Sequence, residues 1–298
     1  MDYNTKRKWY RDVYEETIDV VLKGRYMAED GTEVVLPDDQ DLIAGSRFYE
    51  KAIELEEGQR YKETIINVWN ADSIDAGKRL LDEGFNPVVL NMANHQEPGG
   101  GVIRGSKTQE ESLFRRTNLF RSMYQYASYA SNFGLKRSHH QYPLDWRNGG
   151  VYSPGATVIR DKELRLLSEP FRMSFVAVAA IAHPEVTPDG LLTAREAEVT
   201  KQKMRTIFRI AIHHNHDAVV LGAFGCGAFH NPPHHIARLF QEVMQEPEFL
   251  HRFRKIVFAI LEDSNSPRGG NLRPFREVFL KNNGWMSKIK ELLNAKKR

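Results

Sequence analysis

Residues 91–111 of the chain read NMANHQEPGGGVIRGSKTQEE. Three consecutive glycines, residues 99–101, are followed after seven intervening residues by Gln109, Glu110 and Glu111. Glycine lets the backbone come close to a bulky group, whereas the two acids stand at the start of a predicted helix. The predictions of fold and of function both depend on whether these glycines and acids serve one site.

The segments on either side of this stretch alternate between strand and helix patterns. Apolar runs at 64–70 and 88–93 predict strands, and the second run leads directly into the glycines. A helix is predicted over 73–83, closed by Gly84, and another over 109–126. The other predictions are strands over 151–159, 173–182, 218–221 and 256–261, helices over 194–213, 234–245 and 272–281, a turn at 30–31, and loops over 128–150. This alternation is typical of an α/β sheet domain.

The first part of the chain reads as helical. Trp9, Val13 and Thr17 have helical spacing within a helix predicted over 6–23, and Gly24 is placed to end it. The chain contains no internal repeat and no Pro/Gly/Ser-rich linker that would divide it cleanly.

The composition is that of a globular protein. The 298 residues are enough to bury a sizeable core, and 42 basic against 39 acidic side chains give a formal charge of +3, too small to imply wholesale binding of duplex nucleic acid. The longest apolar run, 175–182, is too short to span a membrane, and the N-terminus lacks the apolar core of a signal peptide. Cys226 is the only cysteine, so no intrachain disulfide can form, and the expected compartment is the cytoplasm.

Several residues with binding chemistry follow directly after predicted strands, where open α/β sheets bind ligands. Residues 222–233 connect a strand to a helix, and Gly225 and Gly227 would let backbone N–H groups approach phosphate oxygens. A tight connection without any ligand is the alternative. Asn94 could bond sugar hydroxyls beside the triple glycine, and Asp72 could accept a hydrogen bond from the amino group of a base or cap the helix that follows it.

Two interpretations of Glu110 and Glu111 stay open. Thr108 and Glu111 have the spacing of a capping box, in which the glutamate reaches back to the first residue of the helix. A cap does not require a preceding triple glycine, whereas cleavage of a glycosidic bond requires an acid beside a sugar-binding cradle. Because adjacent helical residues point about 100° apart, the two carboxyl groups should have different tasks.

The histidines and the cysteine do not predict a metal site or a nucleophile. The eleven histidines include clusters at 213–216 and 230–235, but neither has the spacing of a zinc motif, and the first cluster ends a predicted helix. Cys226 lies between two glycines, where a small filler is expected rather than a thiolate. No metal and no cofactor are predicted.

The triple glycine, seven further residues and the Gln-Glu-Glu run closely resemble the signature of bacterial-type poly(ADP-ribose) glycohydrolases, which have a macrodomain fold. Residues 70–74 resemble the family's adenine-contacting turn, residues 91–94 its ribose-contacting strand end, and residues 225–229 its diphosphate loop. The resemblance covers about residues 64–282. It implies a macrodomain-like mixed α/β sheet flanked by helices, the catalytic domain, over residues 64–298. Residues 1–63 would be a helical N-terminal extension packed on that core.

The resemblance also implies roles for individual residues. Glu111 would be the catalytic acid and Glu110 would hold ribose hydroxyls nearby, while Asp72 would hold adenine. Phe229 would pack against the ribose that is cleaved, with Phe224 as the other candidate. The residues implied to bind the substrate are Asp72, Ser73, Ile74, Asn94, Gly99, Gly100, Gly101, Gln109, Gly225, Cys226, Gly227, Ala228 and Phe229.

The activity that this resemblance implies is hydrolysis of ribose–ribose O-glycosidic bonds in poly(ADP-ribose), with glutamate acid–base catalysis and release of ADP-ribose. The polymer or ADP-ribosylated proteins would be the substrate, with no membrane partner and no direct binding of duplex nucleic acid. Two alternatives remain: a macrodomain that binds ADP-ribose without cleaving it, and a hydrolase of mono-ADP-ribosylated targets. The glutamate pair discriminates between cleavage and binding, because a binding module needs the cradle but not the acid.

Overall fold

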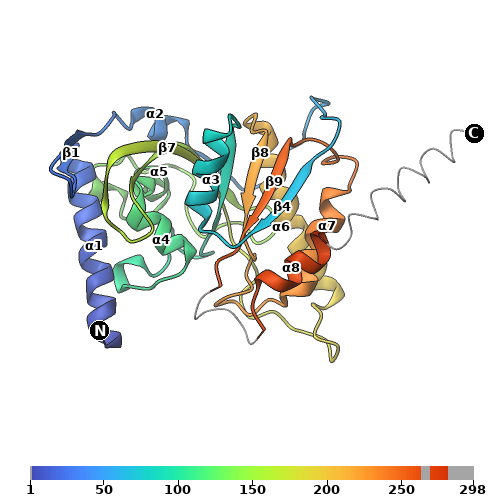
Figure 1. Ribbon diagram of the computed structural model, residues 1–298. Coiled ribbons are helices and arrows are strands. Elements are labelled where there is room, and N and C mark those ends of the chain that lie inside the picture. Colours follow the sequence, from blue (N-terminus) through green and yellow to red (C-terminus); the bar gives the residue numbers. More distant parts are fainter. Residues whose placement is uncertain (1, 263–268, 281–298) are drawn as a thin grey trace, which may run out of the picture.

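The computed structural model describes residues 2–262 and 269–280, and its centre is a seven-stranded mixed sheet (Figure 1). The strand order is β3-β6-β7-β5-β8-β9-β4. The bounds of these strands are β3 (Arg47–Tyr49), β4 (Ile65–Trp69), β5 (Pro87–Met92), β6 (Gly150–Arg160), β7 (Leu166–Val178), β8 (Ala218–Leu221) and β9 (Lys255–Ala259). Neighbours from β7 to β4 are parallel, whereas β6 is antiparallel to both β3 and β7. The prediction of a mixed α/β sheet flanked by helices is therefore confirmed.

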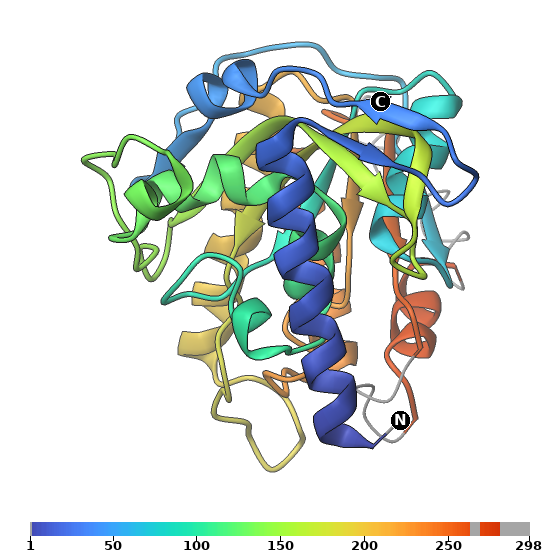
Figure 2. The same cartoon turned by 90° about the vertical axis from the view of Figure 1, so that its left-hand side faces the viewer.

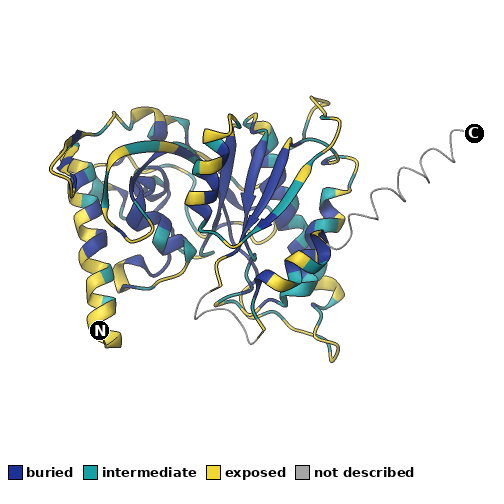
Figure 3. Cartoon of the chain, viewed as in Figure 1, coloured by how far each residue is buried: buried dark blue, intermediate teal, exposed yellow. Residues whose placement is uncertain are grey.

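Helices cover both faces of this sheet. The α-helices are α1 (Tyr3–Lys23), α2 (Gln40–Gly45), α3 (Ser73–Asp82), α4 (Gln109–Arg116), α5 (Leu119–Met123), α6 (Ala194–His213), α7 (Pro233–Met244) and α8 (Leu272–Phe279), and the 3₁₀ helices are η1 (Val102–Arg104), η2 (Tyr124–Tyr126) and η3 (Ala130–Phe133). Alternate side chains of a strand point to opposite faces. Val88 and Leu90 of β5 accordingly pack with α6, α7 and α8, whereas Val89 packs with α3, α4 and α5. Burial on both faces explains the continuous apolar runs of the central strands (Figure 3).

The single helix predicted over 109–126 is wrong, because the chain leaves the helix at Thr117 and resumes it as α5. Thr117 is extended, with φ −139° and ψ 168°. Asn118 explains the break, since its N–H donates to the Thr157 carbonyl at 3.1 Å and its Oδ1 accepts from the Thr157 N–H at 2.7 Å. Hydrogen bonds to β6 thus replace helical ones, and a helical pattern of apolar residues does not reveal this exchange.

Several other boundaries differ from the predicted ones. β7 begins at Leu166 instead of residue 173, because its first half pairs with β6 although it is only partly buried and carries no long apolar run. The strands β7 and β9 end at Val178 and Ala259, short of the predicted residues 182 and 261. The stretch 128–150, predicted as loops, contains η3. The predicted end of the last helix, residue 281, lies outside the described residues.

The residues before β4 form α1, a small sheet of β1 (Arg25–Met27) and β2 (Glu33–Val35), α2 and β3. Gly24, with φ +69°, ends α1 as predicted. β3 pairs with β6 at the edge of the central sheet, so this part of the chain contributes a strand to it. The division of the chain at residue 63 stays a prediction. Within residues 2–262 and 269–280, no helix combines the length and the apolar character that crossing a bilayer would require.

Helix α1 runs along the outside of the molecule (Figure 2) and packs on η1 and α4. Val13 and Thr17 are buried in this contact as their spacing predicts, whereas Trp9 remains partly exposed. Arg7 Nε donates to the Arg104 carbonyl at 3.0 Å. The approach is close at Gly105, where an added Cβ would lie 2.1 Å from the Arg7 carbonyl oxygen.

This close approach predicts an unequal effect of two glycine substitutions. Gly105 and Gly134 both have positive φ (+74° and +66°), so an alanine at either position should cost about 1 kcal/mol of stability from backbone strain. Only at Gly105 would the Cβ also collide with α1, and we expect a further loss of about 1–3 kcal/mol there. Urea unfolding of Gly105→Ala and of the control Gly134→Ala measures the difference. Equal losses would mean that α1 is not held against this loop.

Candidate active site

The carboxyl ends of the parallel strands open into one cavity with a volume of about 960 Å³. Asn70, Met92, Gly222 and Ile260 line it, and each lies at or directly after the end of β4, β5, β8 or β9. Such crevices are the usual ligand sites of open α/β sheets, and the volume is in the range of small-molecule sites.

Most of the residues that the sequence analysis selected line this cavity, and a few lie behind its wall. The lining includes Asp72, Ser73, Asn94, Gly101, Gln109, Glu110, Glu111, Gly225, Gly227, Ala228 and Phe229. Ile74 and Cys226 are instead buried in the two apolar cores, and burial raises the pKa of the Cys226 thiol far above its usual range, which fits a filler and not a thiolate. Phe224 also packs in a core, so of the two phenylalanines only Phe229 faces the cavity.

The carboxyl group of Glu110 is buried and bonded to the loop that follows β5. Its Oε1 accepts from the Gly99 N–H at 3.0 Å and from Asn91 Nδ2 at 3.4 Å, and its Oε2 accepts from the Asn94 N–H at 2.7 Å. The residue is 2% exposed. Burial, and secondarily the charge of Glu111, raise the pKa of Glu110 to about 8, while these donors act in the opposite direction.

Glu111 forms the capping box that its spacing with Thr108 predicts. Its Oε2 accepts from the Thr108 N–H at 2.8 Å and also from the Thr108 hydroxyl, and its Oε1 accepts from the Gly101 N–H at 2.8 Å. The capping interpretation is therefore correct as geometry. Glu111 also lines the cavity, so the cap leaves the carboxyl group at the site.

The triple glycine is needed because the loop passes directly over these two carboxyl groups and α4. Gly100 has φ +53°, and a Cβ there would lie 2.8 Å from Glu111 Oε1 and 3.1 Å from Glu110 Oε2. At Gly99, with φ +79°, a Cβ would lie 2.8 Å from the Phe114 ring. Glycines and acids thus belong to one site, as the spacing of the motif suggests.

Gln109, which lines the cavity, connects three elements at its wall. Its Oε1 accepts from the Met92 N–H at 2.9 Å, and its Nε2 donates to the Leu90 carbonyl at 2.7 Å and to Ser73 Oγ at 3.2 Å. The amide side chain therefore bonds α4 to β5 and α3. Gln109 thus provides hydrogen-bond partners for backbone groups near the end of β5, a role that the sequence analysis did not predict.

Asp72 caps α3, as one of its two interpretations predicts. Its Oδ1 accepts from the N–H groups of Ile74 at 2.9 Å and Asp75 at 3.3 Å. In the loop after β8, Gly225 has φ +73°, and Asn231 Nδ2 donates to its carbonyl at 3.1 Å. A Cβ on Gly227 would meet nothing within 4 Å, so the cavity is open at this residue.

The sequence analysis missed a second group of residues at the site. Trp9 and Tyr10 of α1 line the cavity, and Arg115 holds this helix in place by donating to the Tyr10 carbonyl at 2.9 Å and to the Ser106 carbonyl. In the sequence, the one sign that Arg115 lies near the site was its position one helical turn after Glu111. Nothing in the spacing of Trp9 reveals that α1 reaches the cavity.

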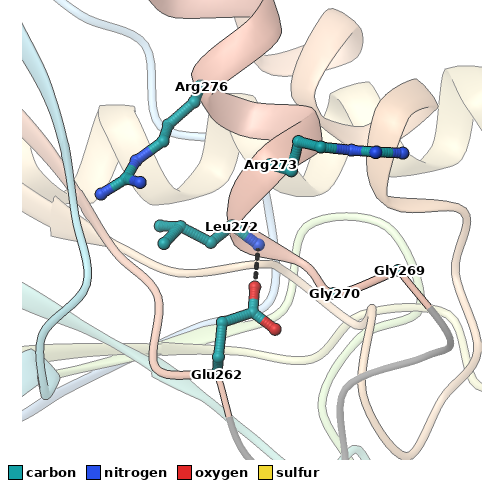
Figure 4. Close-up of a pocket in the computed structure, with 6 residues that line it drawn as sticks. All are labelled: Glu262, Gly269, Gly270, Leu272, Arg273 and Arg276. Atoms are coloured by element: carbon teal, nitrogen blue, oxygen red, sulfur yellow. Dashed lines mark hydrogen bonds between the residues drawn. The ribbon is translucent and has the colours of Figure 1, made fainter.

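Asn271 lines the cavity and is held in place by a hydrogen bond at the start of α8. Figure 4 shows the Glu262 carboxylate accepting a hydrogen bond from the Leu272 N–H, with Arg273 and Arg276 on the adjoining helix. The bond holds the first turn of α8 against the segment that leaves β9. Asn271, which directly precedes this turn, lines the main cavity.

Two histidines of the cluster at 213–216 have partners other than a metal. His214 Nε2 lies 2.8 Å from the Tyr49 hydroxyl and His216 Nε2 lies 2.9 Å from the Tyr152 hydroxyl, and burial lowers the pKa of both imidazoles. In the part of the chain that the structure describes, no three His, Cys, Asp or Glu side chains are grouped so that they could hold a metal ion. Metal independence stays a prediction.

A mixed sheet with a cavity at the carboxyl ends of its parallel strands, bordered by a glycine-rich strand-to-helix loop, defines a macrodomain-like α/β protein. Residues 14–161 match the family model described as microbial-type PARG, catalytic domain, where PARG denotes poly(ADP-ribose) glycohydrolase. The chain belongs to the bacterial-type poly(ADP-ribose) glycohydrolase family.

Solved structures agree with this assignment over most of the chain. PARG from Thermomonospora curvata has a TM-score of 0.77 and 29% identity, with 91% of this chain and 100% of that one covered. The same enzyme bound to the inhibitor ADP-HPD has a TM-score of 0.73 and 28% identity, with the same shares covered. PARG from Deinococcus radiodurans in complex with ADP-ribose has a TM-score of 0.63 and 25% identity, with 83% and 99% covered. Comparison with curated proteins found no match.

The raised pKa of Glu110 predicts a pH-dependent difference in stability between the parent and Glu110→Gln. Below the ordinary pKa of 4.5 the carboxyl is protonated in both the folded and the unfolded chain. Between 4.5 and about 8 only the folded chain keeps the proton, so the parent loses stability as the pH rises, by up to ~1.4 kcal/mol per pH unit. Urea unfolding at pH 5 to 8 should show the variant gaining stability relative to the parent. Parallel pH profiles would contradict the effect of burial on Glu110.

Proposed function

We propose that this protein hydrolyses ribose–ribose O-glycosidic bonds in poly(ADP-ribose) and releases ADP-ribose. The observation that carries the proposal is the buried pair Glu110 and Glu111, both bonded to the triple-glycine loop at the edge of the cavity. The family match supports it, as does the likeness to PARG structures that contain ADP-ribose or the inhibitor ADP-HPD.

In the proposed complex, ADP-ribose lies across the carboxyl ends of the strands. Asp72 accepts a hydrogen bond from adenine, with Ser73 and Ile74 forming the turn below the base, and Asn94 bonds ribose hydroxyls. The diphosphate lies along residues 225–229, where Gly227 leaves room beside the backbone N–H groups. Phe229 packs against the ribose to be cleaved.

The proposed chemistry assigns different tasks to the two acids. Glu111 protonates the departing ribose oxygen as an oxocarbenium-like transition state develops, and its carboxylate then activates the attacking water. Glu110, bonded through both oxygens, holds the ribose hydroxyls. Burial raises the pKa of Glu110 to about 8, so Glu110 keeps its proton near neutral pH, and the carboxyl group of Glu111 borders the same glycine, Gly100.

The second candidate function is binding of ADP-ribose without cleavage. The complete capping box favours it, because Glu111 already has a structural task that a binding module would also need. A hydrolase of mono-ADP-ribosylated targets would use the same two acids and differ only in the leaving group.

The proposal also covers the substrate, the domain organisation and the compartment. The substrate is the polymer or ADP-ribosylated protein, with no metal, no cofactor and no direct contact to duplex nucleic acid. Residues 64–298 would be the catalytic domain, and residues 1–63 an extension packed on it. A single cysteine supports a reducing compartment such as the cytoplasm.

Glu111→Gln separates catalysis from capping. Glutamine can keep the capping-box bond from the Thr108 N–H, but its amide nitrogen cannot accept from the Gly101 N–H, so the melting temperature should fall modestly while the affinity for ADP-ribose changes little. Removal of the acid should slow release of ADP-ribose from the polymer by about 10²- to 10⁴-fold. Product release from labelled polymer measures the rate, and calorimetry measures the affinity. A folded variant that cleaves at nearly the parent rate would contradict the assignment of Glu111 as the catalytic acid.

Gly227→Val tests the diphosphate position. The free protein has room for the side chain, because a Cβ at Gly227 meets nothing within 4 Å, so the melting temperature should be unchanged. The side chain would instead crowd the ligand, and we expect ADP-ribose affinity to fall by about tenfold or more, with Gly227→Ala in between. Undiminished affinity in both folded variants would move the diphosphate away from this loop.

A further inference from the structure

Arg116 is a buried cation at the end of the helix that carries Glu110 and Glu111. It is 1% exposed, yet it does not line the cavity. Its Nη1 donates to Asp72 Oδ1 at 2.7 Å, its Nη2 to Asp75 Oδ1 at 3.3 Å, and its Nε to the Arg160 carbonyl at 3.3 Å. The guanidinium fork therefore joins the C-terminus of α4 to the first turn of α3.

These bonds leave the two oxygens of Asp72 unequal. Oδ1 accepts from the N–H groups of Ile74 and Asp75 as well as from Arg116. Among the described residues, none donates to Oδ2. Asp72 lines the cavity, and its side chain is 20% exposed. One carboxylate oxygen is thus fixed on the protein side and the other is available to a ligand.

The cap of α3 does not require this arrangement. Two backbone N–H groups already complete it, and a cap of this kind works with an exposed aspartate. Burying a guanidinium group costs several kcal/mol of solvation unless its partners are well placed, so a buried pair is weak support for stability alone. What a planar, multiply bonded guanidinium supplies is a fixed direction for the carboxylate that it holds.

We propose that Arg116 is a positioning residue for base specificity, which fixes Asp72 so that Oδ2 faces the amino group of adenine. The inference rests on the proposed function, because it takes adenine as the group that Asp72 meets. Arg116 does not touch the ligand and acts through Asp72. Since Arg116 and Glu111 belong to the same short helix, recognition of the base and placement of the acid are set by one rigid element.

Adenine recognition can be isolated by changing the ligand. In inosine diphosphate ribose a carbonyl oxygen replaces the adenine amino group, so it cannot donate to Oδ2. The parent protein should bind ADP-ribose about tenfold or more tightly than this analogue, because a hydrogen bond to a charged group is lost. In Arg116→Gln this preference should fall to about threefold or less, through weaker ADP-ribose binding, and Arg116→Lys should lie between.

Titration calorimetry of both ligands with each variant gives the ratio of the two Kd values, which a merely structural role would leave unchanged. Arg121→Gln is the matched control, since Arg121 Nε bonds Asp39 at 2.6 Å in a similarly shielded pair away from the cavity. It should lower the melting temperature and keep the parent ratio.

A parent-like ratio in every folded Arg116 variant would overturn the inference, as would equal affinity of the parent for the two ligands. Arg116→Lys keeps the buried charge, so the test does not depend on whether Arg116→Gln folds. A parent protein that binds neither ligand would overturn the proposed function itself, and the inference with it.

Discussion

The hydrogen bonds from the Gly99 and Gly101 amides to Glu110 and Glu111 are the constraint on which the rest of the site depends. They join the loop after β5 to the first turn of α4, so the loop and the helix are held as one unit. Backbone donors replace the water that two buried carboxyl groups lose, which makes their burial tolerable. They also leave no space for a side chain at Gly100.

Capping and catalysis at Glu111 are compatible uses of one carboxyl group. The cap fixes the side chain by bonds from Thr108 to Oε2, while Oε1 bonds Gly101. A group that must meet a reacting atom benefits from such fixation, because an acid held in one geometry loses less entropy when the reaction occurs. A local sequence signal for structure can therefore coincide with a residue that is proposed to act in catalysis.

The sequence predicts the parts of this protein that depend on local pattern. The central strands, the helices on either side and the cavity lining near Asp72 and Asn94 follow from apolar runs, caps and strand ends. The break after α4 does not, because it depends on bonds between Asn118 and a strand far along the chain. The approach of Trp9 to the cavity is likewise a matter of tertiary packing, which spacing within α1 does not encode.

The contacts of α1 also bear on the order in which the chain can fold. Arg7 bonds a residue 97 positions later, Tyr14 meets a tyrosine hydroxyl 110 positions later, and Glu16 pairs with an arginine 144 positions later. Closing such long loops is entropically costly, and a ribosome releases the N-terminus first. Helix α1 is synthesised before these partners, so it must wait until Arg160 has been added before its full set of partners exists. The cavity wall that it supplies can be completed only after β6 has emerged.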